Sequence, residues 1–360
     1  MRIVVWIIGL AILAFLAYFA SIMIPVSGVA QKFEDKLVDQ CRRVDVFPGT
    51  EDVTIDPDTE IAFVSADDRR ADPPRQGGVY AFNTDAPDTV VKVSADDFGE
   101  FHPHGISLWR GPGGEKRLFV INHASDGQKV EIFDVGQGGA LTHAETVAFP
   151  AMTSPNDVLA VGPRQFYATN DRGYRDGLMS TLEGYLALPF ASLVYFDGEK
   201  GEKVVEGLVF ANGVNRSRDG AAVYVSEFLK RRINVYTRDP ASGALTLKKR
   251  LPVMTNPDNI EVARDGGLWI GGHPKVFEFL KHARDPSHPA PSHVVRVYPH
   301  TGENKEFFID TKGRLNASSV GAVWDETLIV GSVFDDHVMV CPMVKIFLEN
   351  AGREADDGVQ

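Results

Sequence analysis

Apolar and polar positions divide the chain into two parts with different patterns. Residues 3–24 form one apolar run without a charged side chain. From residue 45 to residue 340, short apolar segments alternate with clusters of Gly, Asp, Asn and Pro. Short apolar segments bounded by turn-forming residues are typical of β-strands. The pattern therefore predicts an N-terminal helix followed by a large all-β body.

The β body contains a sequence pattern that recurs six times. Each copy has a short polar pair, then a β-branched residue, a turn and a second apolar strand. The first positions of successive copies lie 46 to 60 residues apart. Repeats of this length predict a six-bladed β-propeller, whereas a sandwich would not repeat six times. The pairs are Glu51-Asp52, His104-Gly105, Asn156-Asp157, Asn212-Gly213, Asp258-Asn259 and Ser318-Ser319.

Residues 175–192 depart from the strand pattern. Leu178, Leu182 and Tyr185 fall at near-helical spacing, and no comparable helical period appears elsewhere between residues 45 and 340. Two interpretations remain open. The segment is either a helix that caps the core, or an amphipathic lid that lies beside the site and also contacts lipid.

The apolar run at the N-terminus is long enough to cross a membrane. At about 1.5 Å of rise per residue, residues 3–24 span a bilayer core of about 30 Å. A cleaved signal peptide, which would give a secreted protein, is the alternative, but its apolar region usually has only about 7–15 residues. An uncleaved signal-anchor is therefore favoured. The predicted organisation is an anchor at 1–25, a linker at 26–40, a propeller at 41–345 and a tail at 346–360.

The chain has two cysteines, Cys41 and Cys341, which bracket the predicted propeller. Disulfides persist in oxidising compartments outside the cytoplasm. Two unrelated buried thiols are the alternative, but the bracketing positions favour a disulfide that ties the first strand to the last. Such a disulfide places the body of the protein in an extracellular, lumenal or periplasmic space.

Composition narrows the classes of function. Because 49 acidic residues outnumber 37 basic ones, the net charge is −12, which excludes a nucleic-acid partner that binds by bulk electrostatics. A hydrophobic content of 44% excludes a disordered chain. Two cysteines are too few for a Cys-rich zinc or iron–sulfur site.

Equivalent positions of propeller repeats face one central tunnel, so the polar pairs are expected to lie close together. Buried carboxylates repel one another and lose hydration, so leaving them unpaired would be unfavourable. Calcium takes about 6–8 oxygen ligands in irregular geometry and removes this conflict. The alternative is that these are ordinary turn residues, but recurrence at one register favours a metal site. The candidate donors are Glu51, Asp52, Asp157, Asp258, Asn156, Asn212 and Asn259.

Histidines in strand contexts suggest either zinc ligands or proton-transfer groups. His104 occupies a tunnel position, and His123 lies on the partner strand of the same repeat. Three or four imidazoles can form a zinc site. Two neighbouring imidazoles beside a cation held by carboxylates instead favour a proton-transfer pair. His273 has weaker support, because a lone histidine is more often structural.

From Cys41 to Cys341 the chain resembles the serum paraoxonase/arylesterase family. The resemblance rests on several motifs rather than on one. They are GTEDVTI (49–55), FHPHGIS (101–107), VINHASD (120–126), PNDVLAVGPRQFYATND (155–171), FANGVNRSRDGAAVYVSE (210–227), PDNIEV (257–262), LWIGGHP (268–274) and LIVGSVF (328–334).

The resemblance implies a six-bladed propeller with two calcium ions in its tunnel, one catalytic and one structural. It implies hydrolysis of lactones, aryl esters and some phosphotriesters. His104 and His123 match the histidine dyad of the family, Cys41 and Cys341 match its ring-closing disulfide, and the apolar N-terminus resembles its retained leader. The implied ligands of the catalytic calcium are Glu51, Asn156, Asn212, Asp258 and Asn259. The implied ligands of the structural calcium are Asp52, Asp157 and the backbone carbonyl of Ile106.

Two departures from the family bear on its chemistry. Gly272 stands where the mammalian members have a free cysteine, so thiol chemistry is not expected here. Residues 175–192 correspond to the variable active-site lid of the family but differ from it in sequence. The resemblance therefore leaves the metal site intact and does not fix the substrate preference.

The sequence thus predicts a calcium-dependent hydrolase of lactones and aryl esters. In this hypothesis the metal stabilises the developing oxyanion, and His104, assisted by His123, deprotonates the attacking water. Asp258 is the alternative base or nucleophile. The alternative function is a membrane-tethered binding scaffold with a structural calcium only, which the anchor and the apolar 175–192 segment suggest. Propellers similar to gluconolactonases and strictosidine synthases share the fold but not the FHPHGIS and PNDV motifs together.

Overall fold

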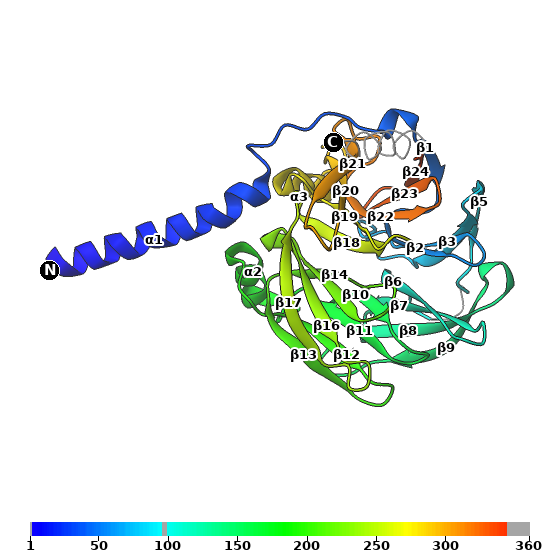
Figure 1. Cartoon of the computed structure of the whole chain (residues 1–360). Helices are drawn as coiled ribbons and strands as arrows, with labels where there is room; N and C mark the ends of the chain where they lie inside the picture. Colours follow the sequence, from blue (N-terminus) through cyan, green and yellow to red (C-terminus); the bar gives the residue numbers. More distant parts are fainter. Residues whose placement is uncertain (1, 96–98, 344–360) are drawn as a thin grey trace, which may run out of the picture.

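The computed structural model describes residues 2–95 and 99–343. Its body consists of six four-stranded antiparallel sheets arranged as the blades of a propeller (Figure 1). The predicted six-bladed β-propeller is therefore confirmed. The predicted tail at 346–360 lies outside the described residues.

Five blades follow the chain in order, and each is a meander of four strands. The first blade contains β2 (Thr50–Asp56), β3 (Ile61–Ala66), β4 (Gly78–Asn83) and β5 (Ala86–Lys92). The second contains β6 (Pro103–Arg110), β7 (Lys116–Ala124), β8 (Gly127–Val135) and β9 (Leu141–Val147). The third contains β10 (Pro155–Ala160), β11 (Phe166–Asn170), β12 (Ala191–Phe196) and β13 (Gly201–Leu208). The fourth contains β14 (Ala211–Arg216), β15 (Ala222–Glu227), β16 (Arg232–Arg238) and β17 (Leu245–Pro252). The fifth contains β18 (Pro257–Val262), β19 (Leu268–Gly272), β20 (Ser292–Val297) and β21 (Asn304–Asp310).

The sixth blade is built from both ends of the propeller. β22 (Ser318–Trp324), β23 (Thr327–Ser332) and β24 (His337–Pro342) are joined by β1 (Arg42–Asp45), which pairs antiparallel with β24. A disulfide between Cys41 and Cys341 links the same two segments. The predicted ring-closing disulfide is thus confirmed, and it fixes the start of the ring to its end.

The first strand of every blade lies next to the first strands of its neighbours and carries a β-bulge. On β2, the register against the second strand shifts between Thr50 and Asp52, and on β10 it shifts between Pro155 and Val158. The same shift occurs at the start of β6, β14, β18 and β22. A bulge bends the strand and redirects its side chains. The repeated polar pairs therefore sit where the strands turn toward the tunnel.

Buried aromatic side chains hold neighbouring blades together. Phe119, Phe166 and Phe196 form part of one cluster between the second and third blades, and each is at most 6% exposed. Phe63 and Phe133 belong to the equivalent cluster between the first and second blades. Burying each such side chain contributes about 1.5–3 kcal/mol. The blades thus form a rigid ring in which the tunnel residues have fixed positions.

Three helices lie at the same end of the propeller (Figure 1). They are α1 (Arg2–Ser27), α2 (Gly177–Leu186) and α3 (Val276–Arg284). Short 3-10 helices also occur at η1 (Val38–Gln40), η2 (Gln137–Gly139) and η3 (Phe228–Lys230). Helix α1 is long and apolar enough to cross a membrane. Its C-terminal end is not free, because Ile22 and Val26 are buried against Ala187, Phe228 and Val276. Helix α2 falls within the 175–192 segment, as expected.

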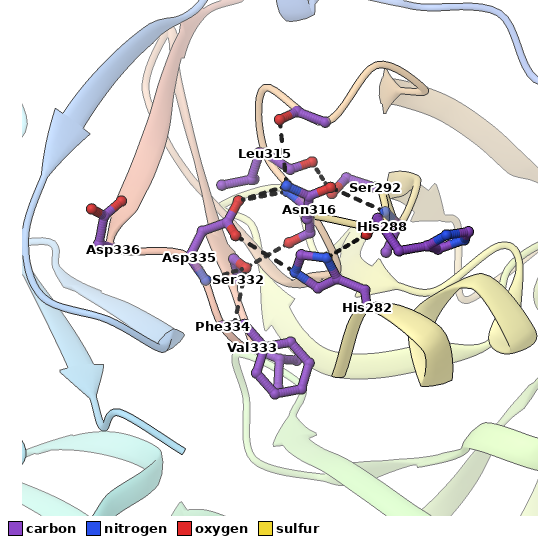
Figure 2. Close-up of polar contacts among 12 residues, drawn as sticks. His282, His288, Ser292, Leu315, Asn316, Ser332, Val333, Phe334, Asp335 and Asp336 are labelled. Atoms are coloured by element: carbon purple, nitrogen blue, oxygen red, sulfur yellow. Dashed lines mark hydrogen bonds and ion pairs between the residues drawn. The ribbon is translucent and has the colours of Figure 1, made fainter. Parts of the chain in front are cut away.

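Helix α3 corrects the sequence analysis, which identified no helical period in this region. The helix is held by contacts with distant segments. The ring of Phe279 packs on His273 with the two centroids 4.1 Å apart. The Nδ1 atom of buried His282 lies 2.7 Å from the carbonyl oxygen of His288, and its Nε2 lies 3.8 Å from the carboxylate of Asp335 (Figure 2). The helix also has a signal of its own that the repeat pattern obscured, because Val276, Phe279 and Leu280 fall at helical spacing.

Candidate active site and metal centre

Polar residues from the bulged inner strands meet at the end of the tunnel that carries the three helices. Four of them line one pocket of about 550 Å³, and Asn259 lies beside them within hydrogen-bond distance of Glu51. Each of the five is at most 7% exposed. The five residues, called the upper cluster below, are Glu51, Asn156, Asn212, Asp258 and Asn259.

The upper cluster holds buried oxygen atoms that have no hydrogen-bond partner in the described part of the chain. They are Glu51 Oε2, Asn156 Oδ1, Asn212 Oδ1 and Asn259 Oδ1. Buried polar atoms are almost always paired, because an unpaired one loses its hydration without compensation. The buried unpaired atoms of these described residues are all oxygens, and they form a donor set suited to a hard cation.

Asp258 and Glu51 supply the two carboxylates of the upper cluster. Burial raises the pKa of Asp258, and a hydrogen bond with His273 only partly offsets this effect. Burial would also raise the pKa of Glu51, but the charge and hydrogen bond of His104, together with the charge of Arg69, lower it to about 2. Glu51 is therefore ionised at neutral pH.

Asp52 and Asp157 lie below the upper cluster and line a second cavity of about 100 Å³ together with Ile106. Each carboxylate accepts the backbone N–H of the following residue and one from the next blade: Ile106 N–H donates to Asp52 (2.8 Å) and Val214 N–H donates to Asp157 (2.6 Å). Burial and the repulsion of neighbouring carboxylates raise the pKa of both groups well above the usual range. A bound cation would relieve that repulsion.

The donors are mostly amides rather than side chains that commonly bind transition metals. Among residues 2–95 and 99–343, no group of three or more His, Cys, Asp and Glu side chains is arranged to hold a metal. Sites built from Asn oxygens and few carboxylates suit calcium, whereas zinc and other transition metals prefer His and Cys. The residues of the upper cluster fit calcium on this chemistry.

His104 and His123 form a hydrogen-bonded pair at the edge of the pocket. Nδ1 of His104 lies 2.8 Å from Nε2 of His123, and Nδ1 of His123 contacts Oε1 of Gln128. An amide oxygen only accepts, so Nδ1 of His123 carries its proton and its Nε2 accepts from His104. Burial lowers the pKa of His123 to about 3, with a further contribution from the charge of His104, so His123 stays neutral. The pair therefore uses Nδ1 of His104 as its donor and leaves Nε2 of His104, 3.4 Å from Oε1 of Glu51, directed at the upper cluster.

Several residues of the site were not singled out or were underrated from the sequence. His273 is 2% exposed, and its Nε2 lies 2.9 Å from Asp258 Oδ2. Gln128 fixes the orientation of His123, and Arg69 lines the pocket. His123 and His273 lie at the end of the second strand of a blade or directly after it, and Arg69 follows the second strand of the first blade by three residues. That shared position is a signal in the repeats, although the residue type differs each time.

The walls of the pocket are apolar and come from all three helices. Val26 of α1, Tyr185 of α2, and Phe277 and Leu280 of α3 line it. Tyr185, Phe277 and Leu280 are also among the exposed apolar side chains of the protein. The pocket therefore combines a polar floor in the tunnel with an apolar mouth, an arrangement that suits a substrate with a polar head and an apolar body.

Comparison with known proteins identifies the family to which the chain is similar. Residues 41–343 match the arylesterase family. Serum paraoxonase/arylesterase 2 of Rattus norvegicus is 37% identical over 246 residues, which cover 66% of this chain and 68% of the relative. Serum paraoxonase/arylesterase 1 of Homo sapiens is 31% identical over 307 residues, which cover 79% of this chain and 84% of the relative.

A solved structure of the gluconolactonase XC5397 from Xanthomonas campestris shares the fold. Its TM-score is 0.55 at 16% identity, and the match covers 86% of this chain and 91% of that one. At this identity the likeness concerns the architecture alone. The family match over the whole propeller and the identity to the curated relatives carry the assignment. The chain belongs to the arylesterase family, which includes the serum paraoxonases/arylesterases.

Proposed function

We propose that this protein is a calcium-dependent hydrolase of lactones and aryl esters. One observation carries the proposal: four buried, unpaired oxygens of the upper cluster lie beside a hydrogen-bonded histidine pair, in which Nε2 of His104 is 3.4 Å from Oε1 of Glu51. Membership of the arylesterase family supports ester and lactone hydrolysis as the reaction class. A phosphotriesterase side activity remains part of the proposal, because the family resemblance suggests it.

The residues divide into two sets of calcium donors. The upper cluster would hold the catalytic ion. Asp52, Asp157 and the backbone carbonyl of Ile106 would hold the structural ion, because they line the deeper cavity. Calcium bound at the upper cluster supplies positive charge that polarises an ester carbonyl.

The histidine pair would supply the base. Nε2 of His104 removes a proton from water, the water oxygen bonds to the carbonyl carbon, and the bond from that carbon to the ring oxygen or aryloxy group breaks. The leaving oxygen takes up a proton, so a lactone yields its hydroxy acid. Protonated His104 faces the ionised Glu51 at 3.4 Å, which stabilises its charge. His123 and Gln128 orient the imidazole of His104 throughout.

Replacing His104 by glutamine tests this role. Wild-type protein is expected to hydrolyse γ- and δ-lactones in the presence of calcium. The His104→Gln variant should lose about 100- to 10,000-fold in kcat, because a positioned general base contributes that much. Its calcium content should stay at the wild-type level. Unchanged lactone turnover in this variant would remove His104 from the mechanism and leave Asp258 as the base.

A membrane-tethered binding scaffold gives no role to this histidine pair. A scaffold with structural calcium has no reason to place a hydrogen-bonded imidazole pair beside unpaired oxygens. The helices instead fit an enzyme that acts at a lipid surface. Helix α1 would anchor the chain with the propeller outside the cytoplasm, and exposed Tyr185 and Phe277 beside the pocket would face the lipid. Lactones with an apolar body would then enter the pocket from the membrane.

A further inference from the structure

The active-site pocket contains an arginine without an acidic partner. Arg69 follows strand β3 and lines the pocket together with Glu51 and His104. Its Nη1 atom donates only to the backbone carbonyls of Asp67 and Val333, at 3.4 and 3.3 Å. Its Nη2 atom is buried and has no hydrogen-bond partner among the described residues. Buried guanidinium nitrogens without an acceptor also occur at Nε of Arg70, Arg172, Arg296 and Arg314. Among the described residues, Arg69 differs from these because it lines the pocket and has no carboxylate partner.

The acidic residues next to Arg69 are occupied elsewhere. The carboxylate of Asp67 lies 2.8 Å from Nδ1 of His102. The carboxylate of Asp68 lies 2.5 Å from Nη2 of Arg75. Within residues 2–95 and 99–343, no carboxylate lies within 4 Å of the Arg69 guanidinium. Asp67 and Asp68 are thus paired with other side chains, and neither carboxylate neutralises the charge of Arg69.

Arg172, the second arginine that lines the pocket, does have an acidic partner. Arg172 donates to Ser180 of helix α2 at 3.1 Å, and its Nη2 lies 3.4 Å from the carboxylate of Asp171. Its charge is balanced by that carboxylate, and its hydrogen bond holds α2. Arg69 is therefore the arginine that suits recognition of a ligand.

The charges of the pocket favour an anion once its metal is bound. The carboxylates of Glu51 and Asp258 would cancel the charge of one divalent ion, and Arg69 would remain as an uncompensated positive charge. The surrounding walls are apolar, which strengthens an ion pair relative to water. A guanidinium also matches a carboxylate with two parallel hydrogen bonds.

We propose that Arg69 binds a carboxylate carried by the substrate, so that the preferred substrates are lactones or esters with an anionic group near the bond that breaks. This inference rests on the proposed hydrolase function and adds the substrate class. Arg69 acts in it as a specificity-determining residue. Hydrolysis itself also forms a carboxylate in every product, and Arg69 could bind that group instead. The experiment separates binding of a substrate carboxylate from binding of the product carboxylate.

The experiment compares two lactones with the same ring. One is 5-oxotetrahydrofuran-2-carboxylate, and the other is γ-valerolactone, in which a methyl group replaces the carboxylate. The wild-type protein with calcium is expected to show kcat/KM about 10- to 100-fold higher for the carboxylate, as for a charge-assisted hydrogen bond. Arg69→Gln should remove this preference, and Arg69→Lys should restore part of it. Arg164→Gln is the matched control, because Arg164 pairs with Glu145 on the surface.

A binding measurement keeps the inference separate from the proposed function. Tetrahydrofuran-2-carboxylate has no bond to hydrolyse, so calorimetric titration of the calcium-loaded protein reports binding alone. Binding to the wild type and to Arg164→Gln, with about 10-fold or greater weakening in Arg69→Gln, shows that Arg69 holds a carboxylate even if no lactone is hydrolysed. Equal binding to Arg69→Gln and to the wild type overturns the inference. An equal kcat/KM for both lactones in the wild type, with Arg69→Gln slowing both alike, assigns Arg69 to the product carboxylate and overturns it.

Discussion

Replacing Glu51 by glutamine is expected to abolish calcium binding at the upper cluster and lactone hydrolysis with it. The substitution removes one of the two carboxylates of the cluster and places an amide N–H₂ group among oxygen donors. Calcium affinity should fall by at least about 100-fold, since even indirect disturbance of a metal site can have an effect of that size. Calcium titration and lactone turnover measure the two effects on the same preparation.

A matched variant separates the loss of a ligand from the loss of a buried carboxylate. Glu131 on β8 is 2% exposed and accepts hydrogen bonds from Asn122 and Thr146 at a distance from the pocket. Glu131→Gln should retain calcium binding and activity. If Glu51→Gln binds calcium as tightly as the wild type, the upper cluster is not the metal site.

The second large effect concerns the closure of the ring. Replacing both Cys41 and Cys341 by serine opens a loop with a sequence separation of 300 residues. The chain-entropy relation for so long a loop gives a loss of up to about 5–6 kcal/mol in the free energy of unfolding. The ring would then be closed by the pairing of β1 with β24 and by the packing of Val44 in the apolar cluster between the sixth and first blades.

Urea unfolding of the wild type under oxidising and reducing conditions measures this loss. Reduced wild type should unfold at the same lower midpoint as the double variant, and reductant should leave the variant unchanged. Equal midpoints for the oxidised wild type and the variant would mean that strand pairing and blade packing close the ring without the disulfide.

The sequence predicts the propeller well because its inner strands are alike. Each inner strand needs the same bulge at the same place, so Glu51-Asp52 and Asn156-Asp157 recur at one register. The polar pairs therefore indicate both the fold and the residues of the upper cluster. The ring-closing disulfide follows from the positions of the only two cysteines.

The remaining parts of the site depend on contacts between distant segments. The position of helix α3 is set by Phe279 against His273 and by His282 near Asp335, partners that lie outside the helix. Gln128 matters only because β-pairing places it opposite His123. The contribution of Val26 to the pocket likewise arises when α1 packs against the helical end of the propeller.

The most direct test of calcium-dependent hydrolysis is to measure metal content and activity together. Purified protein is analysed for bound calcium and assayed on a γ-lactone before exhaustive dialysis against EGTA, after dialysis, and after calcium is returned. We predict two calcium ions per chain at the start, no hydrolysis after their removal, and recovery with calcium but not with magnesium. Full lactone hydrolysis by dialysed protein that contains no calcium would contradict the proposed function.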